Sequence, residues 1–130
     1  MNERVEELFR RQVAEWPLLS AGVAALAGAR TRDLSRGGRG PRVRHIPHRV
    51  ASTTARVDPA SIARRPCFLC PENLFPEQRS LDFGGGLALL CNPFPVVDRH
   101  LTVVHREHRA QRLGGRVDEL LGLAEALPGF

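Results

Sequence analysis

Two cysteines, Cys67 and Cys70, are the residues of this 130-residue chain whose spacing most directly predicts chemistry. Thiolates separated by two residues can bind one tetrahedral zinc ion, because the turn between them wraps the ion. Four ligands complete such a site, so two more are expected from elsewhere in the chain. The candidates are the third cysteine and the five histidines: Cys91, His45, His48, His100, His105 and His108.

The same cysteine pair has two other interpretations, thiol–disulfide exchange and inert structural thiols. A redox pair is expected at the N-terminus of a helix that follows a strand. Here Pro71 comes directly after the pair and the flanking residues are typical of a loop, which disfavours a redox site. An odd number of cysteines does not suggest a disulfide framework either. We therefore favour zinc.

Three histidines, His100, His105 and His108, lie within nine residues. In an extended strand His100 and His108 would be far apart, so the three cannot simply form a local clamp. If the chain turns after Val104, His105 and His108 could approach one site. The alternative for each is a surface or core histidine with a hydrogen-bond partner.

The basic residues outnumber the acidic ones by nineteen to fourteen, and all nineteen are arginine. The absence of lysine is most simply explained by a GC-rich genome, in which arginine codons replace lysine codons. The net charge of +5 therefore does not by itself indicate nucleic-acid binding. Arginines do cluster between residues 36 and 49, at Arg36, Arg39, Arg42, Arg44 and Arg49. A solvated surface is the favoured interpretation of this run, and phosphate contact is the alternative.

The apolar segments are too short for a membrane. The stretch over residues 18–29 contains Ser20, Gly22 and Gly28, whereas a spanning helix needs about 18 predominantly apolar residues. Residues 2–7, four of which are charged, do not resemble a signal peptide. With 42% hydrophobic residues, the chain has enough apolar side chains for the core of one domain. We expect a cytoplasmic protein with no membrane partner.

Helical spacing of apolar residues predicts three helices, over residues 3–15, about 18–28 and 117–127. Trp16 should separate the first two, because the residue before a proline avoids the helical region. Its large ring is expected to anchor the core.

Period-two patterns predict the strands. Residues 29–36 and 41–51 flank a glycine-rich turn, so a β-hairpin is favoured over a disordered glycine loop. Short apolar runs predict buried strands over 87–91 and 101–104. Residues 52–66 look irregular, and residues 72–80 look like a polar loop.

A longer pattern resembles a known superfamily. The pattern consists of Cys-Phe-Leu-Cys-Pro-Glu-Asn, an apolar strand, Asn-Pro-Phe-Pro, and then His-Leu-Thr-Val followed by a further His. It is similar to that of the histidine-triad (HIT-like) superfamily. The likeness is closest to the branch of GDP-L-galactose phosphorylase, galactose-1-phosphate uridylyltransferase and diadenosine tetraphosphate phosphorylase. Within that branch the chain is similar to an uncharacterised bacterial domain family, and the resemblance covers roughly residues 40–112.

The resemblance implies an α+β fold. An N-terminal helical segment, residues 1–28, would precede part of a HIT-like antiparallel sheet with a helix, residues 29–130. The later strand that carries the histidine triad in this superfamily would be absent, so the sheet is expected to be incomplete.

The resemblance also implies roles for individual residues. Cys67 and Cys70 match the paired zinc cysteines, and His108 matches the histidine that often supplies the third ligand. Asn92 lies where the family places a polar residue near the ribose of a nucleotide. His100 matches a structural histidine that is not the nucleophile, and His105 receives no role.

The implied activity is nucleotidyl transfer or phosphorolysis on a nucleotide or nucleotide sugar. Relatives form a covalent nucleotidyl-histidine through a His-x-His motif, which this chain does not contain. We therefore assign no catalytic residue and expect the N-terminal part of such an enzyme, inactive alone, with nucleic acid an unlikely partner. The alternative is a small zinc-stabilised, arginine-rich module that binds nucleic acid or protein.

Overall fold

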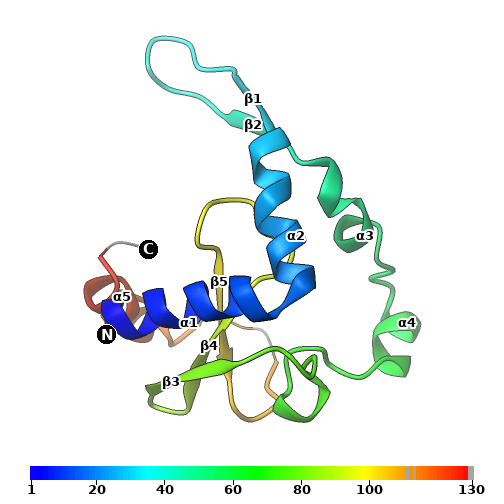
Figure 1. Cartoon of the computed structure of the whole chain (residues 1–130), viewed down its shortest axis with the longest axis vertical. Helices are drawn as coiled ribbons and strands as arrows, with labels where there is room; N and C mark the ends of the chain where they lie inside the picture. Colours follow the sequence, from blue (N-terminus) through cyan, green and yellow to red (C-terminus); the bar gives the residue numbers. More distant parts are fainter. Residues whose placement is uncertain (111, 113, 129–130) are drawn as a thin grey trace.

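The computed structural model of the protein describes residues 1–110, 112 and 114–128 and shows the expected α+β arrangement (Figure 1). At its centre is a three-stranded antiparallel sheet in the order β3-β4-β5. The strands are β3 (Ser80–Gly84), β4 (Leu87–Cys91) and β5 (Leu101–His105). A separate two-stranded sheet, formed by β1 (Arg30–Asp33) and β2 (Arg42–His45), lies earlier in the chain.

Two helices begin the chain, α1 (Asn2–Glu15) and α2 (Pro17–Ala25), and a 3₁₀ turn (Leu26–Gly28) completes the second predicted helical segment. The predicted break is confirmed, because Trp16 has an extended backbone and Pro17 opens α2. Trp16 is only 2% exposed, so it does anchor the core.

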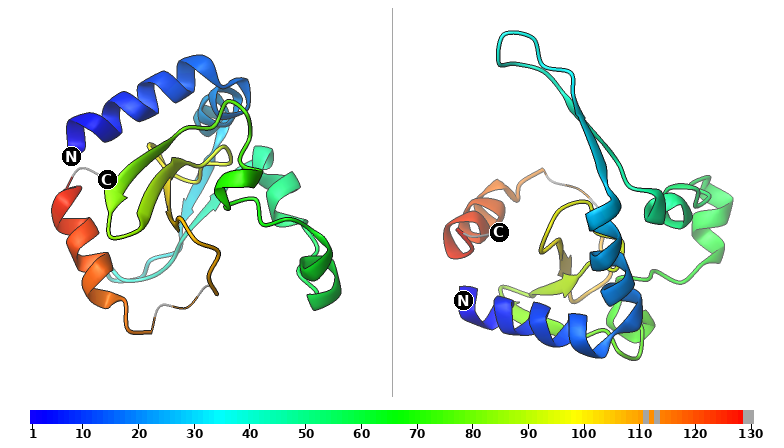
Figure 2. Two further views of the ribbon diagram at one scale, coloured as in Figure 1. Left: turned by 90° about the horizontal axis from the view of Figure 1, so that it is seen from below. Right: turned by 45° about the horizontal axis from the view of Figure 1, so that its top comes forward.

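The predicted hairpin is confirmed by the pairing of β1 (Arg30–Asp33) with β2 (Arg42–His45). Every residue of both strands is exposed. Figures 1 and 2 show the hairpin projecting away from the rest of the molecule. A hairpin without a buried face does not contribute to the core, so its arginines are presented to solvent.

The prediction of irregular structure over residues 52–66 is wrong. The segment includes the end of α3 (Val50–Thr53) and all of α4 (Pro59–Arg64). Asp58 caps α4, since its Oδ1 accepts the Ser61 backbone N–H at 2.9 Å, and Pro59 occupies the first helical turn. The Asp-Pro pair, which also favours turns, is here a helix start.

The central sheet differs from the prediction at two strands. β3 was not predicted, although its residues alternate between half-buried and exposed. β4 is buried throughout, as predicted, but β5 is only partly buried, and its Val103 is 41% exposed. Among the described strands β5 pairs with β4 alone, so the prediction of a second fully buried strand is corrected.

The core lies between the sheet and the helices. One face of β4 packs against α1 and against α5 (Val117–Ala126), the last predicted helix, and Figure 2 shows α1 and α5 near one another. The two adjoining clusters of buried side chains are Val5, Leu87, Leu89, Leu123 and Leu127, and Trp16, Leu19 and Cys91. Within the part of the chain that is described, no helix has the length and apolarity that a membrane crossing requires.

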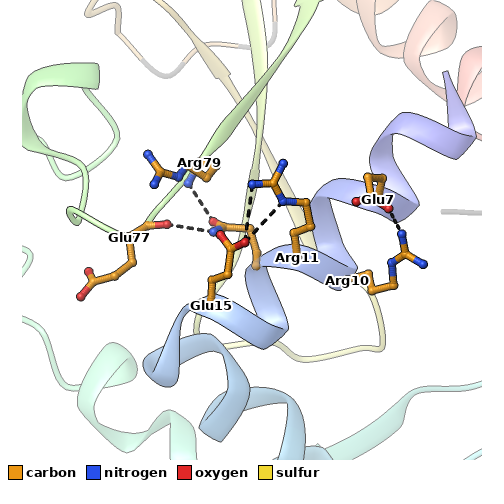
Figure 3. Close-up of polar contacts among 7 residues, drawn as sticks. Glu7, Arg10, Arg11, Glu15, Glu77 and Arg79 are labelled. Atoms are coloured by element: carbon orange, nitrogen blue, oxygen red, sulfur yellow. Dashed lines mark hydrogen bonds and ion pairs between the residues drawn. The ribbon is translucent and has the colours of Figure 1, made fainter.

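One polar side chain of α1, Gln12, is fully buried. Its Nε2 donates to the Glu77 carbonyl at 2.8 Å, and its Oε1 accepts the Arg79 backbone N–H at 2.8 Å (Figure 3). Gln12 therefore fixes the segment that leads into β3.

We expect Gln12→Leu to lower the free energy of unfolding, because two backbone groups lose their partner at a cost of about 1–3 kcal/mol each. Urea denaturation measures the loss. Arg11→Gln is the control, since it removes only the exposed Arg11–Glu15 ion pair one position away and should change stability by less than about 0.5 kcal/mol. Equal stability of the two variants would contradict the role of Gln12 in fixing the segment that leads into β3.

Candidate metal centre and the adjoining loop

The Cys67–Cys70 turn is held in shape by backbone and side-chain hydrogen bonds. The Cys70 N–H donates to the Cys67 carbonyl at 3.2 Å, and Asn73 Nδ2 donates to the same carbonyl at 3.0 Å. A short 3₁₀ helix (Pro71–Asn73) follows directly. The turn therefore places both thiols on one side, with Cys70 buried and Cys67 half-buried.

His108 reaches this turn from the far end of the central sheet. Beyond β5, the Arg106 N–H donates to the Gly86 carbonyl at 2.9 Å, which guides the chain away from the sheet. His108 then lies with its Nδ1 3.2 Å from the Cys70 Sγ, although the two residues are 38 positions apart. The segment after β5 thus brings an imidazole to the two thiols.

The possible ligand atoms of Cys67, Cys70 and His108 all lie within 4.8 Å of one another. Around a tetrahedral ion with ordinary metal–sulfur and metal–nitrogen bonds, such atoms are about 3.5–3.8 Å apart. The cluster could therefore hold a metal ion after small side-chain movements. The three predicted ligands come together, and they are the full set of His, Cys, Asp and Glu side chains in this cluster among the described residues.

Electrostatics at the cluster disfavours a free thiolate at Cys70. Burial raises the pKa of Cys70, and the neighbouring Cys67 and Glu72 raise it further. Redox-active cysteines have the opposite property, a lowered pKa that exposes a reactive thiolate. A bound cation would instead stabilise both sulfurs in the deprotonated form. The cluster is therefore better suited to a metal than to disulfide exchange.

The other candidate ligands lie outside this cluster. Cys91 is completely buried in the core, and burial raises its pKa to about 12, which makes it an inert thiol. His105 lies 2.6 Å, Nε2 to Nη1, from Arg116, the residue before α5. The chain does not turn directly after Val104, because β5 continues to His105, and the segment after β5 brings His108 alone of these histidines to the cysteines.

Asn92 begins the loop between β4 and β5, residues 92–100. Its Oδ1 accepts the Phe94 backbone N–H at 2.9 Å, and its Nδ2 lies 3.5 Å from Thr102 Oγ1. The side chain is half-buried. Asn92 thus shapes this loop with its oxygen, while its amide nitrogen makes one long contact among the described residues.

His100 closes the same loop. Its carbonyl accepts the Asn92 N–H at 3.0 Å, and its Nδ1 accepts the Val96 N–H at 3.3 Å. Burial lowers the pKa of His100, and the nearby charge of Arg49 lowers it further. The Val96 N–H can donate to Nδ1 only when the imidazole is neutral. A neutral ring that holds the loop together is consistent with the structural position that the resemblance implies for His100.

The lowered pKa of His100 predicts a pH-dependent stability. The unfolded chain binds a proton at about pH 6.5, whereas the folded chain does so only at lower pH. Stability should therefore fall as the pH drops below about 7 and level off below the folded pKa. Urea denaturation should show a weaker fall for His100→Gln than for the wild-type chain, and parallel pH profiles would contradict the assignment.

The chain matches the family model of a domain of unknown function, DUF4922, over residues 8–130. The chain belongs to the DUF4922 family. No curated protein and no solved structure matches it. The matched range includes both cysteines, His108 and Asn92, so the candidate metal centre and the adjoining loop lie within the DUF4922 domain.

Two arginines in this DUF4922 domain have contacts that the sequence did not predict. Arg44 Nη1 donates to the Val96 carbonyl at 2.6 Å, and Arg49 Nη1 donates to the Phe94 carbonyl at 2.8 Å. The sequence favours a solvated surface for both residues. Because these bonds join positions 52 and 45 residues apart, no local pattern could have revealed them.

Proposed function

We propose that this domain is a zinc-stabilised part of a HIT-like nucleotidyltransferase or nucleotide phosphorylase that binds a nucleotide or nucleotide sugar. The observation that carries the proposal is the meeting of Cys67, Cys70 and His108 from two distant segments. Two thiols and an imidazole form a donor set that zinc prefers. Such cysteines must remain reduced, which is consistent with the cytoplasm.

Zinc at this cluster would supply a cross-link between the Cys67–Cys70 turn and the segment after β5. Protein residues away from the metal would shape the nucleotide-binding loop. β4 and β5 hold the two ends of the loop over residues 92–100, and Asn92 and His100 fix its shape. The nucleotide part of the proposal is supported by the Asn-Pro-Phe-Pro motif in this loop.

Calorimetric titration of the zinc-loaded chain with ADP, GDP and UDP-glucose tests the proposal. We expect binding of at least one of them and no transfer of the nucleotide. Asn92→Asp should weaken the binding, because it keeps the oxygen that accepts from Phe94 but loses the amide donor. Zinc content and melting temperature should be retained in this variant.

Two results would overturn parts of this account. If the zinc-loaded chain binds none of the three ligands, the nucleotide-binding role is wrong. Nucleotidyl transfer by the chain alone would contradict the assignment of binding without catalysis.

A second candidate function is an arginine-rich module that binds nucleic acid or protein. The exposure of both hairpin strands favours it, because they carry four arginines and the tip carries two more. Against it, residues 30–45 contain no Phe or Trp on which bases could stack. Binding to DNA or RNA that falls steeply with salt would support this reading, and absent or salt-insensitive binding would remove it.

A further inference from the structure

A groove of about 390 Å³ lies where the end of β2 and α3 meet the loop over residues 92–100. Its polar lining consists of Arg44, His45, Arg49 and Thr53, and none of the described residues that line it is acidic. The volume lies within the usual range of small-molecule sites. Its lining therefore favours an anion of small-molecule size.

The two arginines of the groove are positioned by the loop itself. Each uses one Nη1 to donate to a loop carbonyl, Arg44 to Val96 and Arg49 to Phe94. A guanidinium has five N–H donors, and the remaining ones of Arg44 and Arg49 have no acceptor among the described residues. Two guanidinium groups that are held in place and still have unused N–H donors can hydrogen-bond the oxygens of a phosphate group.

One residue, Phe94, joins this groove to the residue proposed to lie near the ribose. The Phe94 N–H donates to Asn92 Oδ1 at 2.9 Å, and the Phe94 carbonyl accepts from Arg49 at 2.8 Å. Asn92 and Arg49 therefore both hydrogen-bond the backbone of the same residue. A nucleotide with its ribose near Asn92 would need to extend only a short distance to reach Arg49 with its phosphates.

We infer that the groove formed by Arg44, His45 and Arg49 binds the phosphate groups of the nucleotide, an inference that rests on the proposed function. The ligand class is a nucleoside diphosphate or its sugar ester. Arg44 and Arg49 hold the phosphate oxygens, and His45 contributes a ring N–H at the rim. The arginines at the hairpin tip take no part in this site, which distinguishes it from a nucleic-acid surface.

The test compares two double variants that remove the same charge. Arg44→Gln with Arg49→Gln changes the groove, and Arg36→Gln with Arg39→Gln changes the exposed hairpin tip. Inorganic pyrophosphate, ADP and adenosine are titrated into each zinc-loaded protein. We expect the groove variant to bind pyrophosphate and ADP about 10–100-fold more weakly, and the tip variant to bind them within about twofold of wild type.

A single variant, His45→Glu, tests the groove without the risk that the double variant loses affinity because it is misfolded. It leaves both loop hydrogen bonds of the arginines intact, so melting should be unchanged while pyrophosphate affinity falls by about tenfold or more. Adenosine binding should be the same in all variants.

Three outcomes would overturn the inference. ADP binding that is equal in the groove variant and the wild type would reject the groove but leave the proposed function intact. Failure of the zinc-loaded wild type to bind either pyrophosphate or ADP would reject both the groove and the nucleotide-binding role. An equal loss in groove and tip variants, with salt-sensitive binding of single-stranded DNA, would identify a nucleic-acid surface instead.

Discussion

Cys70→Ser is expected to abolish tight zinc binding and to lower the melting temperature by about 10–20 °C in zinc-containing buffer. Cys70 is the buried residue of the cluster, and its Sγ contacts the His108 ring. Zinc present at about 1,000 times its Kd would stabilise the fold by about 4 kcal/mol. For a domain of this size, each kcal/mol corresponds to several degrees of melting temperature. Metal analysis and thermal denaturation measure the two effects.

Two comparisons separate the metal from a general loss of packing. Cys91→Ala removes the third cysteine, which lies in the core away from the cluster, so this variant should keep its zinc even where its stability falls. A chelator should lower the melting temperature of the wild-type chain and leave that of Cys70→Ser unchanged. A wild-type melting temperature that does not respond to a chelator would be evidence against the site.

The second large effect is expected for Gly22→Ala in α2. A Cβ on Gly22 would lie 2.2 Å from the Pro93 carbonyl oxygen and 2.9 Å from Pro95 Cδ. Because the neighbours are backbone and a rigid ring, either the helix or the loop must move. Overpacking of this kind costs about 1–3 kcal/mol, which exceeds the helix-propensity gain of about 1 kcal/mol from replacing glycine.

Gly122→Ala is the matched control for this substitution. Gly122 lies within α5, where an added Cβ meets nothing within 4 Å, so the same change should stabilise the chain by about 0.5–1 kcal/mol. Urea denaturation should therefore give opposite signs for the two variants. Gly22→Ala should also weaken nucleotide binding while zinc content stays constant, since Gly22 packs against the loop and not against the cysteine cluster. A Gly22→Ala chain as stable as wild type would contradict the packing of α2 on the loop.

The elements that the sequence predicted are those with strong local patterns. The helical spacing of α1, the break at Trp16-Pro17 and the continuous apolar run of β4 each depend on neighbouring residues. α4 was missed because its Asp-Pro start is equally typical of a turn. β3 was missed because its alternation is carried by two apolar residues, Leu81 and Phe83, next to three glycines.

The candidate site was predictable to a different degree. The cysteine spacing indicated a metal ligand pair by itself, but the choice of His108 among five histidines rested on the family resemblance. The cysteine spacing cannot predict which histidine lies nearby. The structure shows it, because the path of the chain after β5 brings His108 to Cys70. The contacts of Arg44 and Arg49 with the loop depend on where the hairpin ends in space, and they needed the structure.

Cobalt substitution tests the metal centre most directly. The chain, freed of metal and titrated with Co²⁺, is expected to develop the sulfur-to-metal charge-transfer absorption and the intense visible bands of a tetrahedral thiolate site. These bands should saturate near one ion per chain and disappear when zinc is added, and Cys67→Ser, Cys70→Ser and His108→Gln should each weaken or shift them. A titration without charge-transfer bands, or bands that all three variants leave unchanged, would contradict a metal site at Cys67, Cys70 and His108.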